Sequence, residues 1–143
     1  MVKKLLRHSY LSAVGNFKRP SNSYHVLNGH FIYKEPNQFS EYQFEVLLSE
    51  LSKRYRFIRF QEAITLISNL DVPDKPFLSF SFDDAFLECY TIIAPLLEKF
   101  NTNAAFFVNP GVIEKTASFQ KKFIQKNLCL NLSKNFMSWS QII

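Results

Sequence analysis

The sequence predicts a single α/β domain with parallel strands, and three observations support this prediction. Apolar residues make up 47% of the 143 residues, and 16 residues are Phe, which is ample material for a packed core. Segments with strand character alternate along the chain with segments of helical periodicity, as in parallel α/β domains. A strongly apolar run, FLSFSF at residues 77–82, ends abruptly in two aspartates, as expected of a buried strand that leaves a sheet.

The first elements are expected early in the chain. Residues 1–22 have weak periodicity and are interpreted as an N-terminal extension, whereas the domain is expected to span residues 23–143. Its first strand is SYHVLNG at residues 23–29, which ends in the turn signal Asn-Gly. Residues 30–33 are a weaker candidate for a second strand.

The clearest helix begins near Ser40. Ser40 and Gln43 form a capping box, and Phe39 and Phe44 occupy the two positions of a hydrophobic staple around it. Apolar residues then recur at helical spacing and are expected to cover a sheet: Phe44, Leu47, Leu48, Leu51 and Tyr55.

The middle of the chain alternates in the same way. RFIRF at residues 56–60 predicts a strand, and residues 61–70 predict a helix with an apolar face. That face consists of three residues at helical spacing: Ile64, Ile67 and Leu70. Residues 71–76 contain two prolines and are expected to form a loop before the strand at residues 77–82.

A second long helix is expected after Asp83 and Asp84, with a kink at Pro95 and a left-handed end at Asn101. Its common face is expected to hold Phe86, Tyr90, Ile93, Leu97 and Phe100. NAAFFVNPG at residues 103–111 then predicts a strand that runs to a turn. Further along, residues 116–128 have helical character, residues 131–135 are loop-like, and Ser138 is placed to cap a final helix.

Composition excludes several functional classes. The formal charge of +5 arises from basic residues scattered in ones and twos, so no basic stripe indicates a nucleic-acid partner, although an anionic partner or membrane surface is compatible with it. No segment predicts a signal peptide or a membrane span, so a cytoplasmic location is expected. Cys89 and Cys129 lack metal-type spacing, and Cys89 is expected to be a buried free thiol.

The acidic pair Asp83-Asp84 is the main candidate site. In parallel α/β folds, the carboxyl ends of the strands form the floor of the active site. Two carboxylates at such a place can divide the work, one binding a cation and the other acting as a base. Such pairs are also common as solvated turn residues and helix caps, so the pair by itself does not decide between these roles.

The wider sequence resembles the polysaccharide deacetylases, carbohydrate esterase family four. PFLSFSFDDAF, followed by IIAPLLEKFNTNAAFFVNPG, is similar to that family's first motif, a strand ending in T-F-D-D-G before a helix and a further strand. The resemblance, which extends over about residues 23–143, implies an incomplete distorted (β/α) barrel. It also implies metal-dependent hydrolysis of N-acetyl groups on a carbohydrate, with Asp83 as general base and Asp84 as ligand of a divalent metal, usually zinc.

The chain departs from the family pattern in two main ways. Ala85 replaces the usual Gly, which affects the loop if this position requires a positive φ angle. The family's two metal-binding histidines follow in an H-x-x-x-H motif, whereas the three histidines here, His8, His25 and His30, all precede Asp84. His25 is expected to be a hydrogen-bonded structural residue, and His8 and His30 are expected at the surface.

Catalytic zinc normally takes three protein ligands, so the site is expected to be incomplete in this sequence. We therefore expect a truncated chain that is inactive or nearly so, and of marginal stability. The alternative is a non-catalytic remnant or a carbohydrate-binding fragment. A phosphoacceptor receiver domain fits poorly, because no aspartate follows Asp84.

Overall fold

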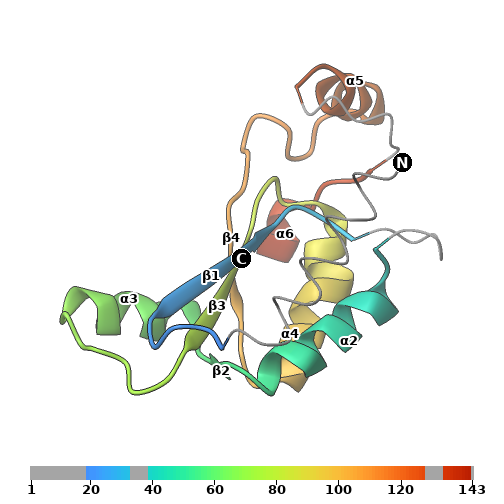
Figure 1. The fold of residues 1–143 in the computed structure, drawn as a ribbon. Coiled ribbons are helices and arrows are strands. Elements are labelled where there is room, and N and C mark those ends of the chain that lie inside the picture. Colours follow the sequence, from blue (N-terminus) through green and yellow to red (C-terminus); the bar gives the residue numbers. More distant parts are fainter. Residues whose placement is uncertain (1–18, 33–38, 128–133, 143) are drawn as a thin grey trace, which may run out of the picture.

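The computed structural model describes residues 19–32, 39–127 and 134–142. Strands and helices alternate through most of this part of the chain, as predicted (Figure 1). In chain order the elements are β1 (Tyr24–Gly29), α2 (Glu41–Ser52), β2 (Arg56–Phe57), α3 (Phe60–Ser68), β3 (Phe77–Phe82), the π-helical turn η1 (Cys89–Ile93), α4 (Ala94–Lys99), β4 (Ala104–Phe106), α5 (Ala117–Asn127) and α6 (Trp139–Ile142).

β3 is the centre of a four-stranded parallel sheet. It pairs with β1 along its whole length, with β2 at its start and with β4 at its end. All six residues of β3 are buried, which is why this segment is a nearly continuous apolar run rather than an alternating one. The predicted α/β class with parallel strands is confirmed. Among the described residues the sheet is open, so the distorted barrel stays a prediction.

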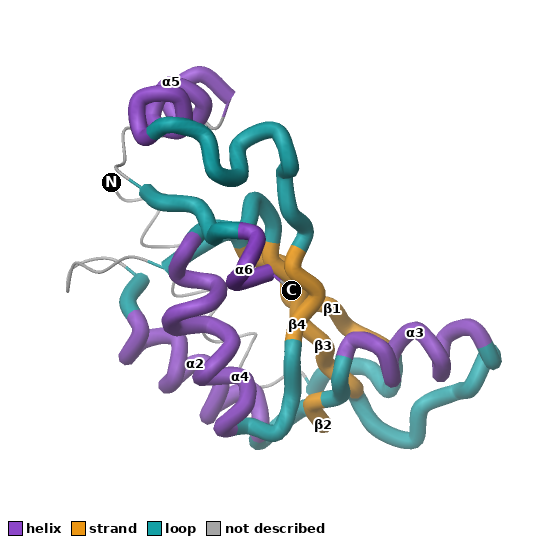
Figure 2. Tube along the Cα trace, turned by 180° about the vertical axis from the view of Figure 1, so that it is seen from behind, coloured by secondary structure: helices purple, strands orange, loops and turns teal. Residues whose placement is uncertain are grey.

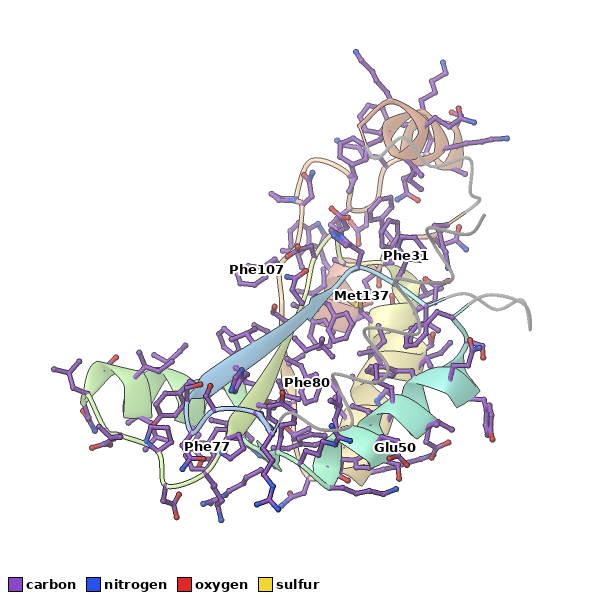
Figure 3. All side chains as sticks on the ribbon, in the orientation of Figure 1. Phe31, Glu50, Phe77, Phe80, Phe107 and Met137 are labelled. Carbon is purple, nitrogen blue, oxygen red and sulfur yellow. The ribbon has the colours of Figure 1, made fainter. Side chains whose placement is uncertain are left out.

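The helices lie on both sides of this sheet. α2 and α4 lie together on one side, whereas α3 lies on the other side near the amino end of β3 (Figures 1 and 2). Alternate residues of β3 point into the larger core beneath α2 and α4, and Phe80, fully buried, lies between sheet and helices (Figure 3). Phe77 packs instead with Ile58 and Ala63 in a smaller cluster under α3.

The sequence signals around α2 are confirmed. The Ser40 backbone N–H donates to Gln43 Oε1 at 2.9 Å, which completes the capping box. The Phe39 and Phe44 rings stack edge to face with centroids 6.2 Å apart, as a hydrophobic staple requires. Phe44 and Leu48 are buried, and the other apolar residues of the predicted face pack against the same core.

The helix predicted over residues 61–70 is present as α3, but the residues at helical spacing are not the ones that it buries. The strand before it is only two residues long, because the helix already begins at Phe60. Ala63 is the residue that α3 buries, whereas the predicted face of Ile64, Ile67 and Leu70 is exposed to solvent. Helical spacing identifies residues that share a face, but it does not state which face a helix turns toward the sheet.

The helix after the acidic pair contains a π-helical turn directly before α4. Pro95 lies in the first turn of α4, where its missing N–H removes no α-helical hydrogen bond, so the irregularity predicted at this proline takes the form of a π-turn. Phe86, Ile93 and Leu97 are buried as predicted, but Tyr90 is half exposed. Asn101 ends the helix with φ of 54°, as predicted.

The remaining elements follow their predictions with shorter bounds. β4 covers three residues of the predicted strand, α5 covers most of the predicted helix, and α6 begins after Ser138. The Ser138 N–H donates to Gln141 Oε1 at 2.9 Å, so this start resembles a second capping box. His30 to Ile32 form no strand, and Tyr33, like residues 128–133, lies outside the described residues. No described helix has the length and apolar character needed to cross a membrane.

Gly29 at the end of β1 is expected to tolerate no larger residue. A Cβ atom placed there would lie 2.8 Å from Cε1 of Phe82, whose buried ring stacks on Phe106. We expect Gly29→Ala to lower the free energy of unfolding by about 1–3 kcal/mol in urea titrations. Gly111→Ala is the matched control, because its nearest contact is an exposed side-chain oxygen at 3.2 Å. Equal effects of the two substitutions would contradict this packing argument.

Candidate active site

The carboxyl ends of β1 and β3 meet at one edge of the sheet. In the parallel register, Gly29 lies opposite Phe82, and the Asp83 N–H donates to the Gly29 carbonyl at 3.0 Å. The residues that follow the two strands are therefore neighbours in space although they are more than 50 positions apart in sequence. His30 and the Asp83-Asp84 pair meet at this edge.

Asp83 is held by a hydrogen-bonded group from both strands. The Asn28 side-chain amide donates to Asp83 Oδ2 at 3.3 Å and to the Ser81 hydroxyl at 3.1 Å. Asp83 itself is partly exposed, so water can reach this residue. An oriented carboxylate that water can reach is a suitable acceptor for a proton.

Asp84 is paired with His30. Nδ1 of His30 lies 3.2 Å from Oδ2 of Asp84, and the histidine side chain is 55% exposed whereas the aspartate side chain is 18% exposed. The prediction that His30 is a surface residue is thus correct for its exposure but misses its contact. The two acidic side chains do not act as a simple solvated turn, because each has a partner from the end of β1.

The turn that presents the pair is left-handed at two consecutive residues. Asp84 has φ of 71° and Ala85 has φ of 55°, and Ala85 is completely buried. Ala85, which stands where the family pattern has Gly, therefore occupies a position with positive φ. Left-handed backbone costs a residue with a Cβ atom about 1–2 kcal/mol, so this turn stores strain directly at the candidate site.

A buried ion pair supports the segment that carries His30. Lys134 Nζ donates to Glu88 Oε1 at 2.8 Å and to the Ile32 carbonyl at 2.7 Å, and each charged side chain is 7% exposed. The same ammonium lies 4.9 Å from the centroid of the Phe31 ring. Oε2 of Glu88 is buried without a hydrogen-bond partner. Neither residue stood out in the sequence, since a single Lys and a single Glu carry no motif.

Cys89 lies behind the site and is a free, buried thiol, as predicted. Burial, together with the neighbouring Glu88 carboxylate, raises the pKa of Cys89 to about 12. Its Sγ lies 3.9 Å from the His30 carbonyl oxygen. The thiol therefore stays protonated at neutral pH and is no candidate for a nucleophile. Cys129 lies outside the described residues.

His25 takes no part in this group. His25 lies four residues before the end of β1, roughly 13 Å away along the strand. Its Nε2 contacts the Ser21 carbonyl oxygen and the Ser23 hydroxyl, and its ring packs edge-on against Tyr55. The structural role predicted for His25 is thus confirmed, whereas His8 lies outside the described residues.

Asp84 and His30 are side chains of types that bind zinc. Their donor atoms lie 3.2 Å apart, which is a hydrogen-bond separation. A catalytic zinc requires a third protein ligand, yet no three His, Cys, Asp or Glu side chains converge on one point within residues 19–32, 39–127 and 134–142. These residues therefore do not hold a complete zinc site.

Among the comparisons with known proteins, only the comparison with solved structures gives matches. No family profile matches the chain, and no curated protein sequence matches it. Among solved structures, IcaB from Ammonifex degensii superposes with a TM-score of 0.64 at 23% identity, over 85% of this chain and 47% of that one. A de-N-acetylase from Aggregatibacter actinomycetemcomitans gives 0.52 at 20% identity, over 83% and 48%.

The BpsB deacetylase domain from Bordetella bronchiseptica superposes with a TM-score of 0.51 at 18% identity, over 87% of this chain and 51% of that domain. Identities in this range establish a common fold and leave the chemistry to the residues of the site. The chain thus shares the fold of these deacetylase structures and spans about half of their length.

Proposed function

We propose that this chain forms part of a metal-dependent deacetylase that hydrolyses N-acetyl groups on a carbohydrate. The observation that carries the proposal is the group of side chains at one sheet edge, Asp83 and Asp84 from β3 with Asn28 and His30 from β1. Three solved structures of the same fold include two that are described as a deacetylase domain and a de-N-acetylase.

In this proposal the two aspartates have different tasks. Asp83, oriented by the Asn28 amide, accepts the proton of the water that attacks the acetyl carbonyl carbon. The proton taken up by Asp83 then passes to the amide nitrogen as the carbonyl carbon–nitrogen bond breaks, so the products are acetate and a free amino sugar. Asp84 and His30 offer two donors to a divalent cation whose further ligands lie outside the described residues. Such a cation would polarise the acetyl carbonyl.

The proposal is tested by amine release from N-acetylglucosamine oligomers, with Zn²⁺ or Co²⁺ varied from micromolar to millimolar concentration. We expect weak metal binding, because two protein donors hold zinc less tightly than three. Asp84→Asn and His30→Ala are each expected to raise the apparent metal Kd at least tenfold. His25→Ala is the matched control and should leave the Kd unchanged.

Release that persists in a chelator, or metal binding that is indifferent to Asp84 and His30, would contradict the proposal. The same amine-release assay tests the prediction that the 143-residue chain alone is inactive or nearly so. The alternative function, a carbohydrate-binding fragment, predicts a different metal readout: the oligomers bind in calorimetry without added metal, and any metal binding does not depend on Asp84 or His30.

A further inference from the structure

α3 presents its apolar side chains to solvent rather than to the sheet. Ile64 and Ile67 are about half exposed, and in the loop after the helix Leu70 is 86% exposed and Val72 is 89% exposed. We name these four residues the α3 tip. The helix and its loop project from the body of the molecule beside the amino ends of the strands (Figure 1). A cluster of exposed apolar side chains of this kind marks an interaction site.

Leu70 is held outward by an unfavourable backbone conformation. Its φ angle is 56°, and the bonds from Leu70 N–H to the Ile67 carbonyl and from Asp71 N–H to the Leu66 carbonyl make it the left-handed residue of a Schellman motif. Glycine is the usual residue at that position, because a Cβ atom is strained there. A large apolar side chain at this position adds strain and exposure without any packing contribution, which indicates a role outside the folding of the domain.

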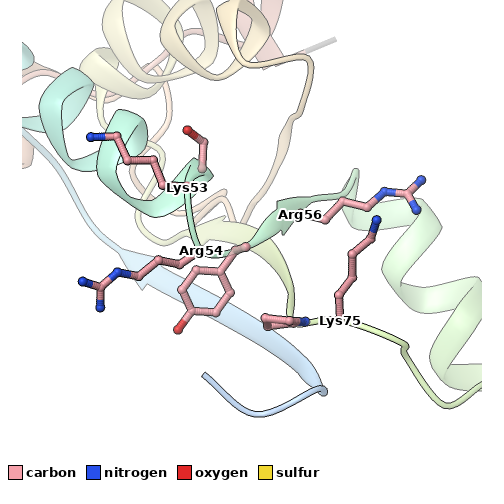
Figure 4. A pocket seen from close by; sticks show the side chains of 7 residues that line it. Lys53, Arg54, Arg56 and Lys75 are labelled. Carbon is pink, nitrogen blue, oxygen red and sulfur yellow. The ribbon is translucent and has the colours of Figure 1, made fainter. Parts of the chain in front are cut away.

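A basic hollow lies beside the first turn of α3, and the loop that carries Val72 of the α3 tip also supplies Lys75 to the hollow. It has a volume of about 330 Å³ and is lined by residues from the end of α2, from β2 and from the loop before β3: Ser52, Lys53, Arg54, Tyr55, Arg56, Lys75 and Pro76. The side chains of Lys53 and Arg54 extend to one side of it, whereas those of Arg56 and Lys75 extend to the other (Figure 4). Arg56 lies 3.9 Å from Glu62 of α3, so the hollow and the helix are neighbours.

The direction of these side chains decides what kind of anion fits. Cations that converge would hold one small anion, whereas cations that spread over an exposed surface match several anionic groups arranged in a plane. Residues 50–76 contain five basic and four acidic side chains, including Glu50, which pairs with Lys53, so the surface keeps a small positive excess. An apolar segment flanked by lysine and arginine is typical of proteins that lie on anionic membranes.

We propose that the α3 tip and the basic hollow form one docking surface for a membrane of anionic phospholipids. The apolar side chains enter the boundary between head groups and acyl chains, and the lysines and arginines contact phosphate groups. The docking surface lies at the amino end of β3, whereas Asp83 and Asp84 lie at its carboxyl end, about 20 Å away. The candidate active site therefore faces away from the lipid, toward a polymer outside the membrane plane.

Vesicle sedimentation with the full 143-residue chain tests this inference. We expect binding to phosphatidylcholine vesicles that contain 30% phosphatidylglycerol, about tenfold or more above binding to pure phosphatidylcholine, and weakening with added salt. Leu70→Gly combined with Val72→Ser is expected to lower binding at least about tenfold. Leu70→Gly alone should preserve or raise thermal stability, because it relieves the left-handed strain, so lost binding cannot be attributed to unfolding.

Charge-reversal variants provide a second test in the same vesicle-binding experiment. Arg54→Glu with Lys75→Glu is expected to abolish the preference for anionic vesicles, whereas Lys121→Glu with Lys122→Glu on α5 serves as the matched control and should retain it. Equal binding to neutral vesicles, or no vesicle binding by the folded chain, would overturn the proposal. Concentration-dependent self-association that disappears in the Leu70→Gly, Val72→Ser variant, without vesicle binding, would also overturn it and assign the α3 tip to a second copy of the chain.

Discussion

Asp83→Asn is expected to lower the rate of deacetylation by about 10²–10⁴-fold, in every preparation of this chain that releases acetate. The amide side chain has nearly the same shape and keeps an oxygen that can accept the hydrogen bond from the Asn28 amide, which measures 3.3 Å in the parent. What it loses is the ability to accept a proton from water. The effect should therefore appear in kcat with little change in the free energy of unfolding.

Asp74→Asn is the matched control for this prediction, because Asp74 is an exposed aspartate in the loop before β3, far from the sheet edge that carries Asp83. It should leave the rate within a factor of two. A chain that retains its rate after Asp83→Asn would require another base, and His30 would be the next candidate because it lies at the same edge.

Lys134→Met is expected to lower the free energy of unfolding by about 3–5 kcal/mol. The substitution leaves the buried Glu88 carboxyl with neither of its oxygens paired, since Oε2 already lacks a hydrogen-bond partner. It also releases the Ile32 carbonyl, which accepts from the same ammonium at 2.7 Å. Domains of this size have total stabilities of about 5–15 kcal/mol, so the variant should be largely unfolded on mild heating.

The double variant Lys134→Met, Glu88→Leu distinguishes the net contribution of the ion pair to the free energy of unfolding from the destabilisation caused by removing only one partner. Two apolar side chains of similar volume remove both buried charges, so most of the lost stability should return. Lys99→Met is the control, because the Lys99–Glu45 pair is exposed and worth less than about 1 kcal/mol. Urea unfolding followed by circular dichroism measures all three, and a Lys134→Met effect under 1 kcal/mol would contradict the argument.

The parts of the fold that depend on neighbouring residues were predictable from sequence. The capping box at Ser40, the left-handed Asn101 and the strand that ends before Asp83 each rest on signals a few residues apart, and each is confirmed. The orientation of α3 was not predictable in this way. Its apolar spacing is real, but the side that faces the sheet depends on contacts with Ile58 and Phe77, which periodicity does not contain.

The candidate site was only half predictable for a similar reason. Asp83 and Asp84 follow an obvious strand, whereas His30 and Asn28 belong to it only because β1 pairs in parallel with β3 in one register. Because parallel strands end at the same edge of a sheet, the residue that follows β1 is expected beside the residues that follow β3. This expectation is the signal that points to His30 near Asp84. Lys134 gave no sequence signal, since its partner is 46 positions away.

The central position of β3 has a consequence for how the chain folds. Every other strand of the sheet pairs with β3, and its longest partner, β1, precedes it by 53 positions. During synthesis the sheet cannot form before residues 77–82 have left the ribosome, so β1 and β2 remain unpaired until then. Parallel pairing across such a span closes a long loop first and is slow. The interval before β3 emerges is therefore when this chain is most exposed to aggregation and most dependent on chaperones.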